Sequence, residues 1–211
     1  MVKPQTPAFK LMKTQVAHLD SGRVFRRSLP NSAQGKTMNR SFRTGAALLI
    51  CCVMPLAQAK RAPNLELRDL RGNKERISDL RGSIAVVNFW ATWCGPCGEE
   101  LPLLATLSQE YGGKKVRFIA ASVNEAKDRA KVDEFLSHRN LALEVWVGAD
   151  TDMMDRAGLG DVLPATLILD EQGEIVARVV GEARKEDVKA PVDWLLSGRT
   201  GPAPTAFTKR Y

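Results

Sequence analysis

The pattern of apolar and polar positions divides residues 60–197 into short apolar runs and segments with helical spacing. The run at 83–90 is almost entirely apolar and rich in valine, as a strand buried on both faces should be. A second buried run follows at 116–123. Between and after these runs, apolar residues recur at the three- to four-residue spacing of amphipathic helices. Strands that alternate with helices predict an α/β domain.

The predicted elements can be placed along this domain. In chain order they are a hairpin within 62–80, a strand at 83–90, a helix from Pro96 to about 111, a strand at 116–123, a helix at 128–138, a strand at 143–147, a short helix at 152–157, a strand at 162–170, an edge-type strand at 174–180 and a helix ending at 196. The tail, 198–211, holds Gly, Pro and Thr without periodicity, so we expect it to be flexible.

Charge is concentrated in the N-terminal part of the chain. The 211 residues hold 31 Lys/Arg and 24 Asp/Glu, a formal net charge of +7. Residues 1–59 carry nine Lys/Arg against one acid, which leaves 22 Lys/Arg against 23 Asp/Glu in the remainder. The predicted domain is therefore close to neutral, and its charge does not favour nucleic acid as a partner.

The basic N-terminal segment has the features of an export signal. Within residues 38–59, two arginines precede an apolar run that closes on small residues of the A-x-A type. We therefore expect residues 1–59 to be a leader with a signal peptide, and the protein to be periplasmic or otherwise extracytoplasmic. The run is shorter than the ~20 residues of a membrane span, so membrane association is expected only if the leader stays uncleaved. Whether translation starts at Met1 or Met38 stays open.

Two of the four cysteines lie in the apolar run of the leader and would be removed with it. The others, Cys94 and Cys97, form a C-x-x-C motif where the first buried strand should turn into a helix. Unpaired N–H groups and the dipole at a helix start favour a thiolate, so the pKa of Cys94 should fall below that of a free cysteine. Cys94 is then the attacking sulfur, and Cys97, one turn into the helix, is the resolving thiol.

Other roles for this pair can be weighed from its neighbours. Haem attachment needs a histidine directly after the second cysteine, where this chain has Gly98. A tetrahedral zinc site needs four ligands, and beyond the leader the chain offers no further cysteine and one histidine, His138. A structural disulfide across so small a loop constrains little of the unfolded chain. The sequence thus favours a redox pair, with no metal and no cofactor.

The stretch NFWATWCGPC followed by EELP, residues 88–102, resembles the thioredoxin superfamily, and within it the exported TlpA/ResA/CcmG-type thiol-disulfide oxidoreductases. The resemblance covers about residues 64–196. It implies a thioredoxin-like fold, with a central mixed β-sheet flanked by helices. It also implies an N-terminal β-hairpin and a helix-strand insert at about 125–150.

The resemblance implies a proton carrier beside the cysteines. Glu100 matches the acid of the W-C-x-x-C-x-x-E-x-P pattern and lies one turn after Cys97 on a helix, where it would relay a proton to or from that sulfur. The alternative is an ordinary first-turn acid that complements the helix dipole. Asn88 stands where cytoplasmic thioredoxins carry a buried acid, and an amide cannot move protons at neutral pH. This departure strengthens the interpretation of Glu100.

Four further residues are expected to bind the substrate. Pro164 falls where the family has a cis-proline beside the cysteines, and the backbone of Leu163 would pair with an extended substrate. The alternative is an ordinary trans proline that opens a strand, and the chain departs from the family at Val162, where the family often has glycine. Trp93, directly before the first cysteine, and Pro96, between the two cysteines, complete the predicted substrate-binding set.

The resemblance implies a function as well as a fold. The protein would reduce disulfides of exported proteins, such as apocytochrome c or metal-site assembly factors, with electrons from a membrane thiol transporter. We expect it to be a monomer. The same sulfurs could serve a disulfide oxidase or isomerase, although the dipeptide Gly95-Pro96 favours reduction. An alternative from another class is a chaperone that holds Cu(I) on Cys94 and Cys97, which usually has further Met or His ligands.

Overall fold

The computed structural model describes residues 61–211, so the predicted leader and signal peptide lie outside the described residues. Its strands are β1 (Glu66–Asp69), β2 (Lys74–Arg76), β3 (Ile84–Trp90), β4 (Val116–Ser122), β5 (Glu144–Val147), β6 (Ala165–Leu169), β7 (Ile175–Gly181) and β8 (Phe207–Arg210). Its helices are α1 (Gly95–Glu110), α2 (Arg129–His138), α3 (Thr151–Arg156) and α4 (Lys185–Leu196), with short 3-10 turns η1 (Ile77–Leu80) and η2 (Ala126–Asp128). Within residues 61–211, no helix has the length and apolarity needed to cross a membrane.

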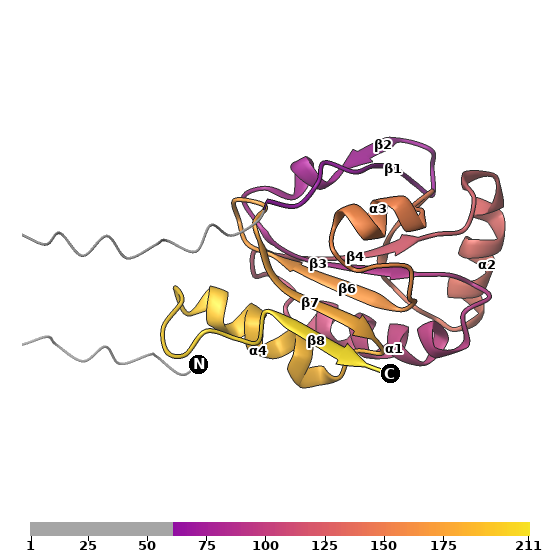
Figure 1. Cartoon of the computed structure of the whole chain (residues 1–211). Helices are drawn as coiled ribbons and strands as arrows, with labels where there is room; N and C mark the ends of the chain where they lie inside the picture. The colour runs from indigo at the N-terminus through magenta and orange to yellow at the C-terminus, as the bar shows by residue number, and fades with distance from the viewer. Residues whose placement is uncertain (1–60) are drawn as a thin grey trace, which may run out of the picture. The chain divides into compact units, whose positions relative to one another are not determined.

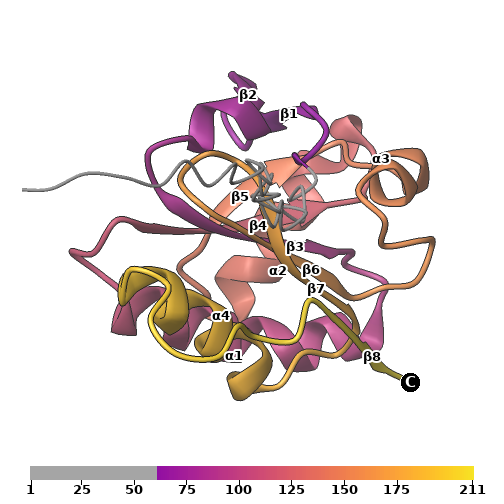
Figure 2. The ribbon, with the colours of Figure 1, turned by 60° about the vertical axis from the view of Figure 1, so that its left-hand side comes forward.

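The strands form one mixed sheet in the order β2-β1-β5-β4-β3-β6-β7-β8. Strand β3 lies in its middle, parallel to β4 and antiparallel to β6. Helices α1 and α4 cover one face of the sheet, and α3 covers the other (Figure 1 and Figure 2). The predicted α/β, thioredoxin-like architecture with its N-terminal hairpin is confirmed. The predicted insert is present as α2 and β5, and β5 joins the hairpin to the sheet by pairing with β1.

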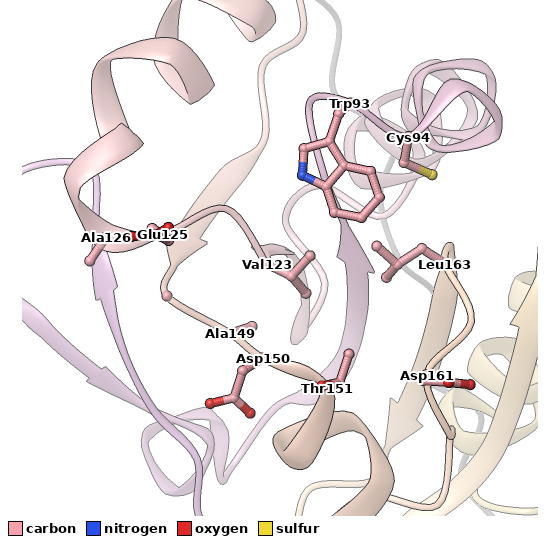
Figure 3. Close-up of a pocket in the computed structure, with 11 residues that line it drawn as sticks. Trp93, Cys94, Val123, Glu125, Ala126, Ala149, Asp150, Thr151, Asp161 and Leu163 are labelled. Carbon is pink, nitrogen blue, oxygen red and sulfur yellow. The ribbon is translucent and has the colours of Figure 1, made fainter.

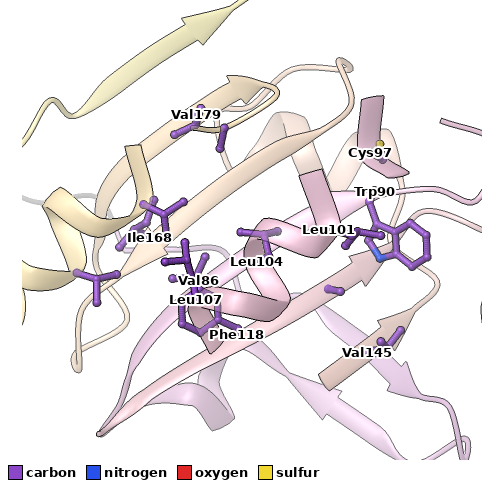
Figure 4. Close-up of a cluster of buried hydrophobic side chains, with 14 of the residues drawn as sticks. Val86, Trp90, Cys97, Leu101, Leu104, Leu107, Phe118, Val145, Ile168 and Val179 are labelled. Atoms are coloured by element: carbon purple, nitrogen blue, oxygen red, sulfur yellow. The ribbon is translucent and has the colours of Figure 1, made fainter. Parts of the chain in front are cut away.

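Two hydrophobic clusters fill the space between the sheet and the layers on its two faces. All seven residues of β3 are buried, and their alternation sends Val86 and Trp90 towards α1 and sends Val87 and Phe89 towards the other face. Figure 4 shows the α1 side, where Cys97, Leu101 and Trp90 lie close to one another. By the same alternation, Asn88 faces α1 from beneath.

Two sequence expectations at the C-terminus are wrong. The strand predicted at the sheet edge, β7, is covered on its outer side by β8, which pairs with it in parallel from Arg178↔Phe207 to Gly181↔Arg210. The predicted flexible tail, 198–211, therefore contains a strand of the sheet. Four residues are too few to show a periodic apolar pattern, so the sequence does not predict this strand. Contacts with residues distant in the sequence hold the strand in place. One is the ion pair of Arg210 with Asp187, at 2.6 Å.

Candidate active site

Cys94 stands at the junction between the central strand and the first helix. It is the N-cap of α1, with an extended backbone (φ −89°, ψ 107°), and Pro96 lies in the first turn as predicted. Cys94 and Cys97 form a disulfide, with Cα atoms 5.3 Å apart. The backbone N–H of Cys97 donates a hydrogen bond to Sγ of Cys94 at 3.3 Å. After reduction, the same donor would stabilise a thiolate on Cys94.

The two sulfurs differ in their access to solvent. Both cysteines belong to the hydrophobic cluster beneath α1, but Cys94 is 8% exposed and Cys97 is 0% exposed. A protein disulfide can therefore approach Cys94 and not Cys97. The roles expected from the sequence, attack by Cys94 and resolution by Cys97, stay a prediction.

Polar side chains hold the loop that leads to Cys94. Oδ1 of Asn124 accepts a hydrogen bond from the backbone N–H of Thr92 at 3.0 Å, and its Nδ2 donates to Oγ1 of Thr92 at 2.8 Å. Oγ of Ser122 donates to the same Oδ1 at 2.8 Å. The end of β4 thus fixes the loop that follows β3. Sequence reasoning missed these residues, since nothing local indicates that the two strand ends meet.

Glu100 is buried on α1, one turn after Cys97, with an exposed fraction of 1%. Its Oε1 accepts a hydrogen bond from the backbone N–H of Ala183 at 2.9 Å, and its Oε2 accepts one from Nδ2 of Asn88 at 2.9 Å. Burial raises the pKa of Glu100 to about 7, while these two hydrogen bonds act in the opposite direction and the charge of Glu182 adds to the increase. Glu100 can therefore change its protonation state near neutral pH.

Asn88 lies beneath Glu100, as the alternation of β3 requires. Its Nδ2 also donates to Oγ1 of Thr166 on β6 at 3.0 Å, and its buried Oδ1 has no hydrogen-bond partner among the described residues. This orientation of the amide suits an ionised Glu100, which can only accept hydrogen bonds. The opposite orientation would let Oδ1 accept a hydrogen bond from the carboxyl O–H of a neutral Glu100. One amide can thus serve both protonation states.

The loop before β6 brings the predicted proline to the site. The peptide bond between Leu163 and Pro164 is cis, as the resemblance implies. The carbonyl of Pro164 accepts a hydrogen bond from the backbone N–H of Gly181 at 2.9 Å. The loop is thereby attached to the end of β7, next to the segment that carries Ala183.

A pocket of about 800 Å³ opens beside Cys94. In Figure 3, the ring of Trp93 lies over one end of it together with Cys94 and Leu163, and acidic side chains lie towards the other end. The acidic lining residues are Glu125, Asp150 and Asp161. Trp93 is 70% exposed, so its indole is available for contact with another molecule. Of the four predicted substrate-binding residues, the pocket contains Trp93 and Leu163 and does not contain Pro96 or Pro164.

The first turn of α1 has one further contact that sequence reasoning missed. Pro102 has no N–H, so it cannot pair with the carbonyl of Gly98. Nη1 of Arg139, which follows α2, donates to that carbonyl at 3.4 Å, and its guanidinium lies 4.5 Å from the ring centroid of Phe135. A proline inside a predicted helix is the signal that a donor is needed, although it does not say which donor. Within residues 61–211, no group of three or more His, Cys, Asp or Glu side chains is placed to hold a metal ion.

Comparisons with known proteins agree with this geometry. The AhpC/TSA family matches residues 59–178. The thiol-disulfide oxidoreductase ResA of Bacillus cereus is 33% identical over 130 residues, which cover 62% of this chain and 73% of ResA. The thioredoxin-like protein YneN of Bacillus subtilis is 33% identical over 143 residues, covering 65% of this chain and 80% of YneN.

Solved structures show the same architecture. A thiol-disulfide oxidoreductase from Bacteroides fragilis superposes with a TM-score of 0.56 at 25% identity, covering 64% of this chain and 99% of the other. A thiol:disulfide interchange protein from Chlorobium tepidum, at 24% identity, has a TM-score of 0.56 and covers 66% and 98% of the two chains. This second likeness concerns the fold alone.

A thioredoxin-like sheet with a C-x-x-C disulfide at the start of α1 defines the class of protein, a thiol-disulfide oxidoreductase. Within that class, the chain belongs to the AhpC/TSA family.

Proposed function

We propose that the protein is exported and reduces disulfides in other exported proteins. The observation that carries this proposal is the arrangement at the start of α1. A sulfur at the helix N-cap faces the pocket, and its buried partner lies one turn from a carboxyl group that titrates near neutral pH. Attack by one thiol and proton transfer at the other are the two requirements of dithiol reduction.

The reaction begins with the reduced protein. The Cys94 thiolate attacks one sulfur of the substrate disulfide, which forms a mixed disulfide and releases the other substrate sulfur as a thiolate. The Cys97 thiol then passes its proton to the ionised Glu100 and attacks Sγ of Cys94. This step releases the second substrate sulfur and forms the Cys94–Cys97 disulfide. Two electrons have then moved to the substrate, and a membrane thiol transporter would supply their replacement.

The pocket supports a protein segment as the substrate. Trp93 and Leu163 would cover apolar side chains next to the substrate cysteine, and the Leu163 backbone would pair with the extended segment. Asp150 and Asp161 would favour basic side chains further along it. Apocytochrome c and metal-site assembly factors are the proposed targets, with the protein acting as a monomer.

The direction of electron flow is tested by the reduction potential of the Cys94–Cys97 pair. We expect a potential close to that of thioredoxin, about −270 mV, and a value near −120 mV would indicate an oxidase instead. Reduction of a protein disulfide by the dithiol form, lost in Cys94→Ser, tests the activity itself. N-terminal sequencing of the protein from the extracytoplasmic fraction tests export and cleavage.

A further inference from the structure

The C-terminal strand β8 reaches the segment that carries the hydrogen-bond donor to Glu100. This segment, Gly181–Arg184, connects β7 to α4. Gly181 ends β7 and pairs in register with Arg210 of β8, and two residues later the backbone N–H of Ala183 donates to Oε1 of Glu100 at 2.9 Å. The segment thus contacts β8 at Gly181 and the buried carboxyl group at Ala183.

Arg210 holds this segment from outside. Its Nη2 donates to Oδ1 of Asp187 at 2.6 Å, and its Nε donates to Oδ2 at 3.0 Å. The same Oδ2 accepts the backbone N–H of Arg184 at 2.9 Å, at the N-cap of α4. Asp187 is thereby tied to Arg210 on β8 and to the residue directly after Ala183. The pair is partly shielded from solvent, because the exposed fractions of the Asp187 and Arg210 side chains are 9% and 30%.

The contact at Gly181 is closely fitted. Its φ is +94°, a conformation that L side chains rarely adopt, and a Cβ atom there would lie 2.9 Å from the carbonyl oxygen of Arg210. The N–H of Gly181 also donates to the carbonyl of Pro164 at 2.9 Å. Gly181, whose lack of a side chain lets β8 pack this closely, is therefore hydrogen-bonded directly to the proline loop of the active site.

We propose that β8, through Arg210, positions the Ala183 N–H against Glu100, so that residues beyond the family match at 59–178 form part of the redox centre. Arg210 is a positioning residue in this scheme. It acts on Glu100 through Asp187, Arg184 and Ala183. The functional meaning of this control rests on the proposed proton transfer at Glu100.

The surroundings of Glu100 set the direction of the effect. It is contacted by Asn88 from β3 and by Ala183 from the segment before α4, Cys97 lies one turn earlier on α1, and the charge of Glu182 opposes its ionisation. The Ala183 N–H lowers the pKa of Glu100. Weakening that hydrogen bond should therefore raise the pKa further above its ordinary value.

The test is a carbon-13 NMR titration of the Glu100 carboxyl group in the oxidised protein, with the signal assigned from Glu100→Gln. Arg210→Gln should move the midpoint upward by roughly half to one pH unit, the equivalent of one hydrogen bond. Lys209→Gln is the matched control, since it removes the same charge from the same strand without touching Asp187. It should move the midpoint by less than half as much.

Either of two results overturns the proposal. One is a folded Arg210→Gln protein with an unchanged midpoint, and the other is an equal shift in Lys209→Gln, which would show a general effect of charge. If Arg210→Gln does not fold, Arg210→Lys replaces it. A single ammonium cannot make the two parallel hydrogen bonds of the guanidinium to Asp187, so the midpoint should still move upward, by less than in Arg210→Gln, and an unchanged midpoint overturns the proposal. The titration needs no turnover, so its outcome is independent of whether the protein reduces exported substrates.

Discussion

The backbone N–H of Cys97 donates to Sγ of Cys94 across 3.3 Å, within the first turn of the helix that Cys94 caps. The contact connects the sulfur that we propose as the attacking one to the residue that we propose as its resolving partner, in the form in which a disulfide already joins them. A donor in this position stabilises negative charge on Sγ, as does the dipole of the sixteen-residue helix α1. The prediction for Cys94 follows from it.

Cys94 should react faster with iodoacetamide at pH 7 than a free cysteine, because a larger fraction of it is thiolate. The measurement uses the reduced Cys97→Ala protein, in which Cys94 is the only cysteine of residues 61–211. Unfolding the same protein in urea should lower the reaction rate of Cys94 to that of a free cysteine, since the helix start is then lost. Equal rates in the folded and unfolded protein would contradict the proposed role of the helix.

Glu100→Gln should change how stability depends on pH. The folded protein keeps the Glu100 proton up to about pH 7, whereas the ordinary pKa of a glutamate, which applies in the unfolded chain, is 4.5. Between these values the folded state binds more protons, so the stability contributed by Glu100 is present below pH 4.5 and is lost as pH rises towards 7. As pH rises from 4.5 to 8, the free energy of unfolding of the variant should therefore increase by roughly 3 kcal/mol relative to that of the parent.

Urea unfolding of the oxidised parent and variant at several pH values measures this difference. Glu99→Gln is the control, because Glu99 is the exposed neighbour of Glu100 on the same helix turn. It should follow the parent at every pH. A constant difference between Glu100→Gln and the parent would show that Glu100 does not titrate in this range.

Glu100→Gln should also slow the second chemical step and spare the first. Attack by Cys94 needs no proton from Glu100, whereas attack by Cys97 needs its proton removed. Loss of a positioned base typically costs at least about 10²-fold. Rapid quenching with acid should therefore trap a mixed disulfide between Cys94 and a peptide in the variant and little in the parent. Equal amounts of trapped complex would exclude the relay.

Gly181→Ala should destabilise the protein more than Gly82→Ala. Both glycines have positive φ, +94° and +87°, so both substitutions carry a similar conformational cost, about 1–3 kcal/mol. Only at Gly181 would the new Cβ meet the backbone of Arg210, whereas the site at Gly82 is open. The additional loss should be about 1–3 kcal/mol in denaturant unfolding. Equal losses would show that β8 moves aside freely.

Trp93→Ala should weaken recognition of protein substrates and leave the fold intact. The indole is 70% exposed and lines the pocket beside Cys94, so its removal takes away substrate contacts and few internal ones. We expect kcat/KM for a protein disulfide to fall roughly 5- to 30-fold, as at an interface hot spot. Stability should change by less than about 0.5 kcal/mol.

The control for this prediction is Tyr211→Ala, which removes an aromatic ring that is 74% exposed and lies outside that pocket. It should leave kcat/KM unchanged. A small dithiol-derived disulfide provides a second comparison, because it does not extend along the pocket and should be reduced equally well by both variants. If Trp93→Ala impaired the small substrate as strongly, Trp93 would act on Cys94 itself and not on substrate binding.

Local signals allowed much of this protein to be predicted. The apolar run of β3, the cysteine at the helix start and Pro96 in the first turn all depend on neighbours a few residues away. The position of Cys97 inside the helix follows from the same turn. The spacing of Glu100 from Cys97 placed both on one side of α1, and both are buried. The resemblance carried by residues 88–102 added the cis bond at Pro164.

The wrong expectations at the C-terminus and the site residues that the sequence did not predict have a common cause. The sequence predicts a flexible tail because four strand residues of mixed character carry almost no periodic signal, and it therefore places β7 at the edge of the sheet. Asn124, Thr166 and Arg139 were missed because their partners lie on other elements. None of these residues belongs to a local motif, so no periodicity could have identified them.

By itself, the amino-acid sequence determined where the reactive sulfurs stand and that a helix begins at the first of them, because capping and periodicity act over a few residues. Only the tertiary structure decided what surrounds Glu100. Its hydrogen-bond partners lie 12 and 83 residues away in the chain, at Asn88 and Ala183. The burial that raises its pKa exists only when the sheet, α1 and the segment before α4 have packed together.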